Sequence, residues 1–240
     1  MFNKVYELKY SDTDELMRLK PSVFFEYLED IAAKNADTLD FGYESIYSEG
    51  FGWFLLKYAI EIYKYPKNLS FVKLETEPRG TNRLFVHRDF YLYDDKNNLI
   101  GKAASTWALI DLKNKTMLNP KETLKDKIWE FEKREDDLKY NKIMPITSAD
   151  YEKTFEIRFD DIDVNRHVNN TKYITWALES LPADFLRTKT IRRADIQYKK
   201  DITYGNSIIS SVQITDDKTL HSIKNAETQE DLCILMFEWN

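Results

Sequence analysis

The chain has 240 residues, with 35 Lys and Arg against 41 Asp and Glu, which gives a formal net charge of −6. It is 42% hydrophobic and 14% aromatic, and this excludes an intrinsically disordered chain, because disorder requires few apolar groups to bury. The negative balance argues against general nucleic-acid binding, which requires a basic surface. A single cysteine, Cys233, excludes an internal disulfide framework and a multi-thiolate zinc site.

The sequence predicts neither a membrane span nor a targeting segment. No stretch reaches the ~20 predominantly apolar residues of a spanning helix. The first ten residues alternate polar and apolar, which is typical of a strand and unlike a signal peptide or an Arg- and Ser-rich transit peptide. We therefore expect a soluble, cytoplasmic protein.

The first half is predicted to hold a strand, a long helix and a four-stranded meander. The strand covers Lys4–Tyr10, and a polar turn follows over Ser11–Glu15. Apolar residues at helical spacing, with Pro21 at the start and Gly42 at C′, predict a helix over Pro21–Asp40. Aromatic and β-branched runs, joined by turn-like PKN, PRGTN and DDKNN segments, predict four strands: Trp53–Tyr65, Phe71–Glu77, Leu84–Tyr93 and Leu99–Leu112.

A charged segment, Lys121–Asp150, then separates two similar halves. We interpret it as a partly helical linker with a solvated face rather than a ligand site. A strand (Glu152–Phe159), a turn (Asp160–Asn165) and a helix (Val168–Ser180) follow. Four more strands are predicted: Thr190–Lys200, Ser207–Thr215, Thr219–Asn225 and Leu232–Trp239. The predicted division is a domain over 1–125, a linker over 126–150 and a domain over 151–240.

The two halves look like copies of one unit. Tyr10–Asp30 aligns without gaps over Phe159–Glu179 at an offset of 149 residues, and Ile60 matches Ile196 at an offset of 136. Since the order of predicted elements repeats together with the residues, we favour internal duplication. Chance similarity of two amphipathic segments is the alternative.

The copies differ in the turn before the second helix. There Asn165 and His167 replace Leu16 and Arg18, beside Asp163. A helix N-terminus favours developing negative charge, and Asn and His can orient a carbonyl or a water and share protons near neutral pH. The alternative is that Asp163 and Asn165 only form turn hydrogen bonds and a helix cap.

The segment DIDVNRHVNNTKYITWALESLP (Asp161–Pro182) resembles the signature of acyl-ACP thioesterases, the plant-type enzymes that end fatty-acid synthesis and their bacterial relatives. Further blocks look like those of the family, and the resemblance covers nearly the whole chain. They are WFLLKYAIEIYKYP (Trp53–Pro66), ETEPRGTNRLFVHRDF (Glu75–Phe90), STWALIDLKNKTMLNP (Ser105–Pro120) and ADIQYKKD (Ala194–Asp201). The resemblance implies an α+β double hot-dog fold, in which each half wraps a curved antiparallel sheet around one long helix.

The resemblance also implies the catalytic groups: Asp163, Asn165, His167 and Asp201. The plant enzymes usually carry Glu and then Cys where this chain has Asp201 and Ile202, so cysteine cannot be the nucleophile, and Cys233 is interpreted as an inert buried thiol. Asp201 could instead be a surface partner of Lys199 or Lys200. No cofactor is expected, and three widely separated histidines without HExxH spacing argue against a metal site.

The implied activity is hydrolysis of a fatty acyl-ACP to free fatty acid and holo-ACP. In our hypothesis Asp201 acts as general base on water, Asn165 and His167 position the water or the carbonyl, and Asp163 holds the turn. Backbone N–H groups at the helix start would receive the oxyanion. In the rival mechanism a carboxylate attacks directly.

The implied partner is the acidic acyl carrier protein, which needs a basic surface. The densest basic stretch is either that surface or ordinary surface charge: Arg187, Lys189, Arg192, Arg193, Lys199 and Lys200. The first domain would hold the acyl chain near Phe24, Phe25, Leu28 and Ile31, some of which are core in the alternative interpretation. An acyl-CoA thioesterase and a non-catalytic acyl-thioester-binding protein remain rival functions. Pairing into a homodimer is left open.

Overall fold

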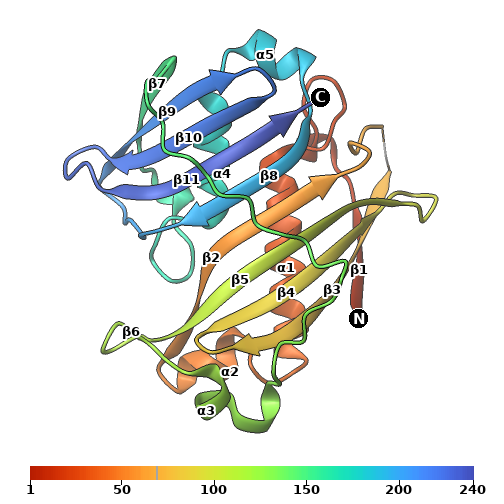
Figure 1. Cartoon of the computed structure of the whole chain (residues 1–240), viewed down its shortest axis with the longest axis vertical. Coiled ribbons are helices and arrows are strands. Elements are labelled where there is room, and N and C mark those ends of the chain that lie inside the picture. Colours follow the sequence, from red (N-terminus) through yellow and green to blue (C-terminus); the bar gives the residue numbers. More distant parts are fainter. Residues whose placement is uncertain (69) are drawn as a thin grey trace.

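The computed structural model describes residues 1–68 and 70–240, and its strands form one antiparallel sheet (Figure 1). The first half contributes β1 (Phe2–Glu7), β2 (Phe51–Ile62), β3 (Phe71–Asn82), β4 (Phe85–Tyr93), β5 (Leu99–Asp111) and β6 (Thr116–Met117). The second half contributes β7 (Tyr151–Glu156), β8 (Ile191–Tyr198), β9 (Ser207–Thr215), β10 (Lys218–Asn225) and β11 (Asp231–Trp239). The strand order is β1-β3-β4-β5-β2-β8-β11-β10-β9-β7, with β6 paired to β5.

Two long helices cover one face of the sheet: α1 (Pro21–Asp37) and α4 (Asn170–Glu179). They contact each other, and the two half-sheets join where β2 pairs with β8, with Tyr58 opposite Ile196. The shorter helices are α2 (Tyr43–Ser48), α3 (Pro120–Leu124) and α5 (Ala183–Thr188), and 3₁₀ turns are η1 (Tyr10–Asp12), η2 (Lys125–Lys127) and η3 (Phe159–Asp161). This is the double hot-dog fold that the resemblance implies. No helix of the described residues is long and apolar enough to cross a bilayer.

The helix α1 begins at Pro21 as predicted but ends earlier than predicted. Pro21 fits the first helical position, where no backbone N–H is needed. The helix ends at Asp37, and Asp40 adopts a left-handed conformation with φ 55°. Gly42 is therefore not its C′ residue but the N-cap of α2, a helix that the sequence analysis missed. Each large apolar side chain that α1 buries against the sheet, such as Leu28, contributes about 1.5–3 kcal/mol of transfer free energy.

The PRGTN segment is not a turn, contrary to prediction. Pro78–Asn82 continues β3, and the pairing with β4 shifts between Pro78 and Gly80. A bulge tolerates proline because its missing N–H breaks no regular ladder bond. Gly80 has φ +89°, and a Cβ there would lie 2.5 Å from the carbonyl oxygen of Trp129. The chain reverses one step later, at Arg83, which has φ 57°.

The backbone repeats between the halves as the duplication predicts. The turn η3 recurs 149 residues after η1, and α4 starts 149 residues after α1. Met17 and Arg166, at the same offset, both adopt positive φ, 58° and 64°. Because α4 has 10 residues and α1 has 17, the second copy is shorter between helix and strand.

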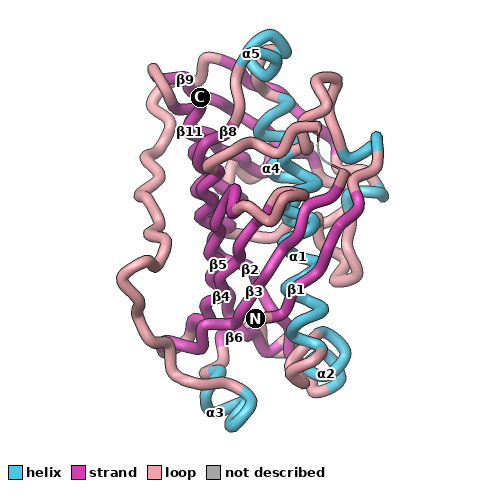
Figure 2. Tube along the Cα trace, turned by 90° about the vertical axis from the view of Figure 1, so that its right-hand side faces the viewer, coloured by secondary structure: helices cyan, strands magenta, loops and turns pink. Residues whose placement is uncertain are grey.

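The linker crosses the sheet on the face opposite the helices (Figures 1 and 2). Only its start is helical, in α3 and η2. Arg79 holds it by pairing with Asp89 of β4 and with Asp137 of the linker (2.7 Å), and by donating to the carbonyl oxygen of Glu132 (2.7 Å). Part of the linker's charge therefore anchors it to the sheet, contrary to the prediction that its charged face is solvated.

Candidate functional site

The turn before α4 is built by Asp163. Its Oδ1 accepts hydrogen bonds from the backbone N–H groups of Asn165 (2.8 Å) and His167 (3.3 Å), and its N–H donates to the carbonyl oxygen of His167 (2.8 Å). Aspartate forms such turns because its short carboxylate reaches backbone donors a few residues ahead. Asp14 makes the equivalent bonds in the first half. Asp163 thus shapes the turn, as predicted.

Asp201 meets this turn from the loop after β8. Its Oδ2 lies 3.0 Å from Nε2 of His167. A hydrogen bond from the N–H of Val168 to the carbonyl oxygen of Ile202 (2.9 Å) ties the loop to the turn. Lys199 and Lys200 pair instead with Asp231 and Glu230, so the partner of Asp201 is the histidine and not a neighbouring lysine.

A pocket of about 200 Å³ opens at the junction of the halves. All four predicted site residues line it, together with residues of both halves: Trp53, Phe54, Leu55 and Leu56 of β2, Asn170 and Tyr173 of α4, and Tyr198 of β8. The ring of Phe54 meets the ring of His167 edge to face, with centroids 6.3 Å apart. The pocket therefore combines proton-transfer groups with an apolar wall, a pairing suited to a ligand with a reactive polar end and an apolar body.

Almost all backbone N–H groups at the start of α4 already donate hydrogen bonds within the protein. Few of them are therefore available to bind the predicted oxyanion. From Asn165 to Lys172, a fully described segment, every N–H group donates to a protein acceptor except that of Asn170. Asn169 caps the helix, because its Oδ1 accepts from the N–H of Thr171 (2.9 Å). Asn170 itself lines the pocket. The expectation of several backbone donors is therefore replaced by one.

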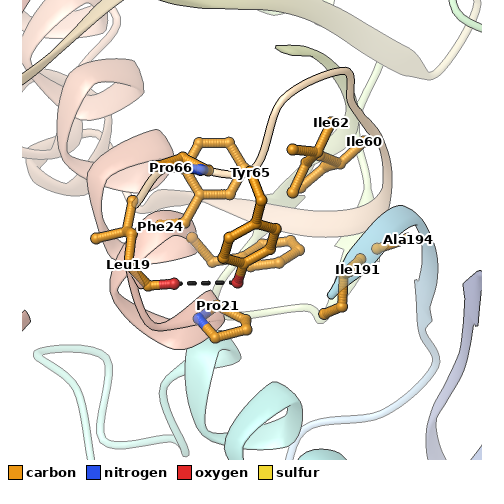
Figure 3. A pocket seen from close by; sticks show the side chains of 10 residues that line it. Leu19, Pro21, Phe24, Ile60, Ile62, Tyr65, Pro66, Ile191 and Ala194 are labelled. Atoms are coloured by element: carbon orange, nitrogen blue, oxygen red, sulfur yellow. Dashed lines mark hydrogen bonds between the residues drawn. The ribbon is translucent and has the colours of Figure 1, made fainter. Parts of the chain in front are cut away.

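The residues predicted to hold an acyl chain form core. Leu28 and Ile31 are fully buried. Phe24 and Phe25 line a separate space between α1 and the sheet (Figure 3), but this space has a volume of only about 10 Å³. Tyr65 is fixed beside it by a hydrogen bond to the carbonyl oxygen of Leu19 (3.0 Å). The first half contributes to the larger pocket through β2 instead.

The predicted basic stretch is not a free positive surface. Arg193 is only 9% exposed and pairs with Asp195 (2.7 Å) and Glu61 (2.6 Å). Its side chain also donates to the carbonyl oxygen of Lys139 and so holds the linker. Four of the remaining five residues pair with carboxylates: Arg187, Arg192, Lys199 and Lys200. Most of these charges are locally neutralised.

The sequence analysis missed a buried polar cluster behind the pocket. Glu29 of α1 lies beside the side-chain amide of Asn170, and burial raises the pKa of Glu29 to about 8. Nearby, the hydroxyls of Tyr58 and Tyr173 are buried and have no hydrogen-bond partner among the described residues. The available signal was the position of Glu29, four residues after Phe25 and three before Ala32, on the apolar side of the predicted helix.

Cys233 lies fully buried in β11, as its interpretation as an inert thiol required. Burial raises the pKa of this thiol well above its ordinary value. Because the thiolate is the reactive form, Cys233 is not poised as a nucleophile.

Two family models match the chain. The family model of the acyl-ACP thioesterase N-terminal domain matches residues 1–127, and that of the C-terminal domain matches residues 146–240. A chloroplastic acyl-[acyl-carrier-protein] hydrolase of Cuphea viscosissima is 25% identical over 199 residues, which cover 78% of this chain and 48% of that protein. Oleoyl-acyl carrier protein thioesterase 2 of Arabidopsis thaliana is 26% identical over 211 residues, covering 78% of this chain and 58% of that protein. The chain thus spans about half the length of the curated relatives it matches.

Two solved bacterial structures share the whole fold. A putative oleoyl thioesterase from Lactobacillus plantarum has a TM-score of 0.88 and 24% identity, covering 100% of this chain and 95% of that one. An acyl-ACP thioesterase from Bacteroides thetaiotaomicron has a TM-score of 0.88 and 24% identity, covering 100% of this chain and 97% of that one. The likeness extends over both halves and the linker.

Proposed function

The chain belongs to the acyl-ACP thioesterase family, and on that premise we propose that it hydrolyses fatty acyl-ACP to a free fatty acid and holo-ACP. The proposal rests on one observation: the Asp163–His167 turn and Asp201 meet in one pocket, which apolar residues of β2 also line. In this division of labour the domain over 151–240 supplies the chemistry. The domain over 1–125 supplies the acyl-binding wall through β2.

The proposed reaction begins with a water molecule held between Asp201 and the side chain of Asn165. Asp201 takes a proton from the water, whose oxygen attacks the thioester carbonyl carbon, and the C–S bond then breaks to release the thiol. His167, in contact with Asp201, orients this carboxylate and can pass the proton to the departing sulfur. The N–H group of Asn170 is the backbone donor available to the oxyanion.

The roles of the four residues are tested by single substitutions. We expect His167→Ala, Asn165→Ala and Asp201→Asn each to lower kcat by about 10²–10⁴-fold, the range of a lost acid–base group, with unchanged far-ultraviolet circular dichroism. Internal duplication offers a matched control for the turn residue. Asp14→Ala removes the same kind of turn bonds as Asp163→Ala, so only the latter should reduce turnover strongly. Equal losses in the two variants would reduce Asp163 to a structural residue.

The first assay is free-thiol release from acyl-ACPs of C8 to C18, with the matched acyl-CoAs alongside. Release from the ACP thioesters, lost in His167→Ala, is the expected result and gives the chain-length preference. Release from the CoA thioesters alone would make the chain an acyl-CoA thioesterase. Binding without release would make it an acyl-thioester-binding protein. A single turnover in ¹⁸O water tests direct attack: if Asp201 forms an anhydride that water opens at the Asp201 carbonyl carbon, the first label enters Asp201 and not the fatty acid, whereas attack by water on the thioester labels the fatty acid at once.

A further inference from the structure

A carboxyl group from the first half reaches the catalytic side of the second. Glu29 lies on α1, which contacts α4, and the side-chain amide of Asn170 lies beside it. Oε1 of Glu29 is buried and has no hydrogen-bond partner among the described residues. A buried carboxyl with an unsatisfied oxygen costs free energy, and such groups are retained where they serve the site.

The polar contact occurs only on the side that carries the catalytic turn. At the 149-residue offset that relates the halves, Glu29 corresponds to Leu178, and Asn170 corresponds to Pro21. Leu178 is buried and apolar, and proline has no side-chain donor. Because neither equivalent position carries a polar side chain, the fold itself does not require a carboxyl at position 29.

Glu29 lies beside Asn170, the residue whose backbone N–H is free at the start of α4. Asn170 lines the pocket, and its N–H is the donor of the turn not already used by the protein. Tyr198, which also lines the pocket, donates from its hydroxyl to the carbonyl oxygen of Asn170 (3.2 Å). Asn170 is thus held at its carbonyl by β8, its side chain lies beside Glu29 of α1, and its N–H is free.

We propose that Glu29 is a positioning residue of the active site, which fixes Asn170 so that its backbone N–H faces the thioester oxyanion. This rests on the proposed hydrolase function.

The charge of Glu29 changes near neutral pH. Because burial raises its pKa to about 8, Glu29 is uncharged at neutral pH. On ionisation it places a second negative charge beside Asp163, where the oxyanion also develops. The charged and titratable groups that interact with it are Glu26 on α1, Asp163 on the turn, Tyr58 on β2 and Tyr198 on β8. On α4, Lys172 interacts with Glu26 and Tyr173 with Asp163. The pKa of each phenol in that set is raised, so none of them ionises near pH 8.

The test is the pH dependence of acyl-ACP hydrolysis between pH 6 and 9.5, corrected for uncatalysed thioester hydrolysis. We expect wild-type kcat to fall about tenfold per pH unit above a single ionisation near pH 8. Glu29→Gln, which keeps an uncharged hydrogen-bonding group, should keep near wild-type kcat at pH 7 and lose the alkaline decline. Glu29→Ala should lower kcat about tenfold at pH 7 with little change in KM. Glu26→Gln, an exposed neighbour one turn away, should keep the decline.

The possible outcomes distinguish a failure of the positioning role of Glu29 from a failure of the proposed hydrolase function. An alkaline decline that persists unchanged in Glu29→Gln overturns the positioning role while the hydrolase function stands. Inactivity of the wild type toward every acyl-ACP overturns the hydrolase function itself. If Glu29→Ala fails to fold, the profile of Glu29→Gln still decides the question.

Discussion

The buried imidazole of His221 makes the second half sensitive to acid. His221 lies on β10 and is 1% exposed, with Nε2 2.8 Å from Oγ1 of Thr219 and its ring against Phe237, centroids 5.1 Å apart. Its Nδ1 has no partner among the described residues. Burial without an acidic partner disfavours the charged imidazolium and lowers the pKa of His221 from 6.5 to about 3.

The sign of the effect follows from which state takes up the proton. Below pH 6.5 the unfolded chain protonates this histidine, whereas the folded chain keeps it neutral until about pH 3. The unfolded state therefore binds more protons, and the free energy of unfolding falls as the pH falls. At about 1.4 kcal/mol per pH unit, His221 alone removes about 4 kcal/mol between pH 7 and pH 3.5. That is a large part of the 5–15 kcal/mol typical of a folded protein.

Urea unfolding at half-unit steps from pH 7 to pH 3.5 measures this loss. The carboxylates also titrate in the window, so the informative quantity is the difference between wild type and His221→Leu. We expect the variant to lose about 4 kcal/mol less over the window. Thr219→Val is the control, because it removes hydrogen bonds to His221 and Trp239 but not the titrating ring; it should lower stability at every pH and keep the wild-type slope. Parallel losses in wild type and His221→Leu would refute the reasoning.

Three further predictions concern the linker, the bulge and the thiol. Arg79→Met should lower the free energy of unfolding by about 1–3 kcal/mol, because it leaves the half-buried carboxylates of Asp89 and Asp137 unpaired, and this loss should exceed that of Asp137→Asn in the same urea titration; equal losses would contradict this. Gly80→Ala should cost at least ~1 kcal/mol, since the new Cβ meets the Trp129 carbonyl and φ is positive, and an unchanged melting temperature would count against it. Cys233→Ala should keep full thiol-release activity while losing about 1 kcal/mol of stability; a fall in kcat greater than twofold would restore a role for the thiol.

The order and type of the main elements could be predicted because their patterns are local. Alternating β-branched and aromatic runs mark the strands, and the apolar spacing after Pro21 marks α1. The predicted boundaries were wrong where one residue type is compatible with two local structures. Gly42 is as suitable for a helix end as for a helix start, and Gly80 is as suitable for a bulge as for a turn.

The site likewise contains one part that could be predicted from local sequence and one part that could not. Asp163, Asn165 and His167 lie within five residues, so their proximity could be read from the chain alone. The contact between His167 and Asp201, and the position of Glu29 behind Asn170, depend on how two halves pack. No local pattern specifies such packing. A glutamate among apolar helical positions could have indicated a buried carboxyl, but not which residue it faces.

The duplicated turn explains why the chain has one candidate site and not two. In both halves an aspartate closes the same turn, but the residue four positions later differs. Arg18 returns to Asp14 through Nε (2.7 Å) and donates to the carbonyl oxygens of Leu186 (2.8 Å) and Lys189 (2.9 Å). A guanidinium suits this use because it has five donors and cannot act as a base near neutral pH. His167 at the equivalent position contacts Asp201 instead and faces the pocket. The first copy of the turn thus binds the second half at α5 through Arg18, whereas the second copy places His167 in the pocket. The packing of the two halves and the activity of the site therefore depend on different residues at equivalent positions of the repeated turn.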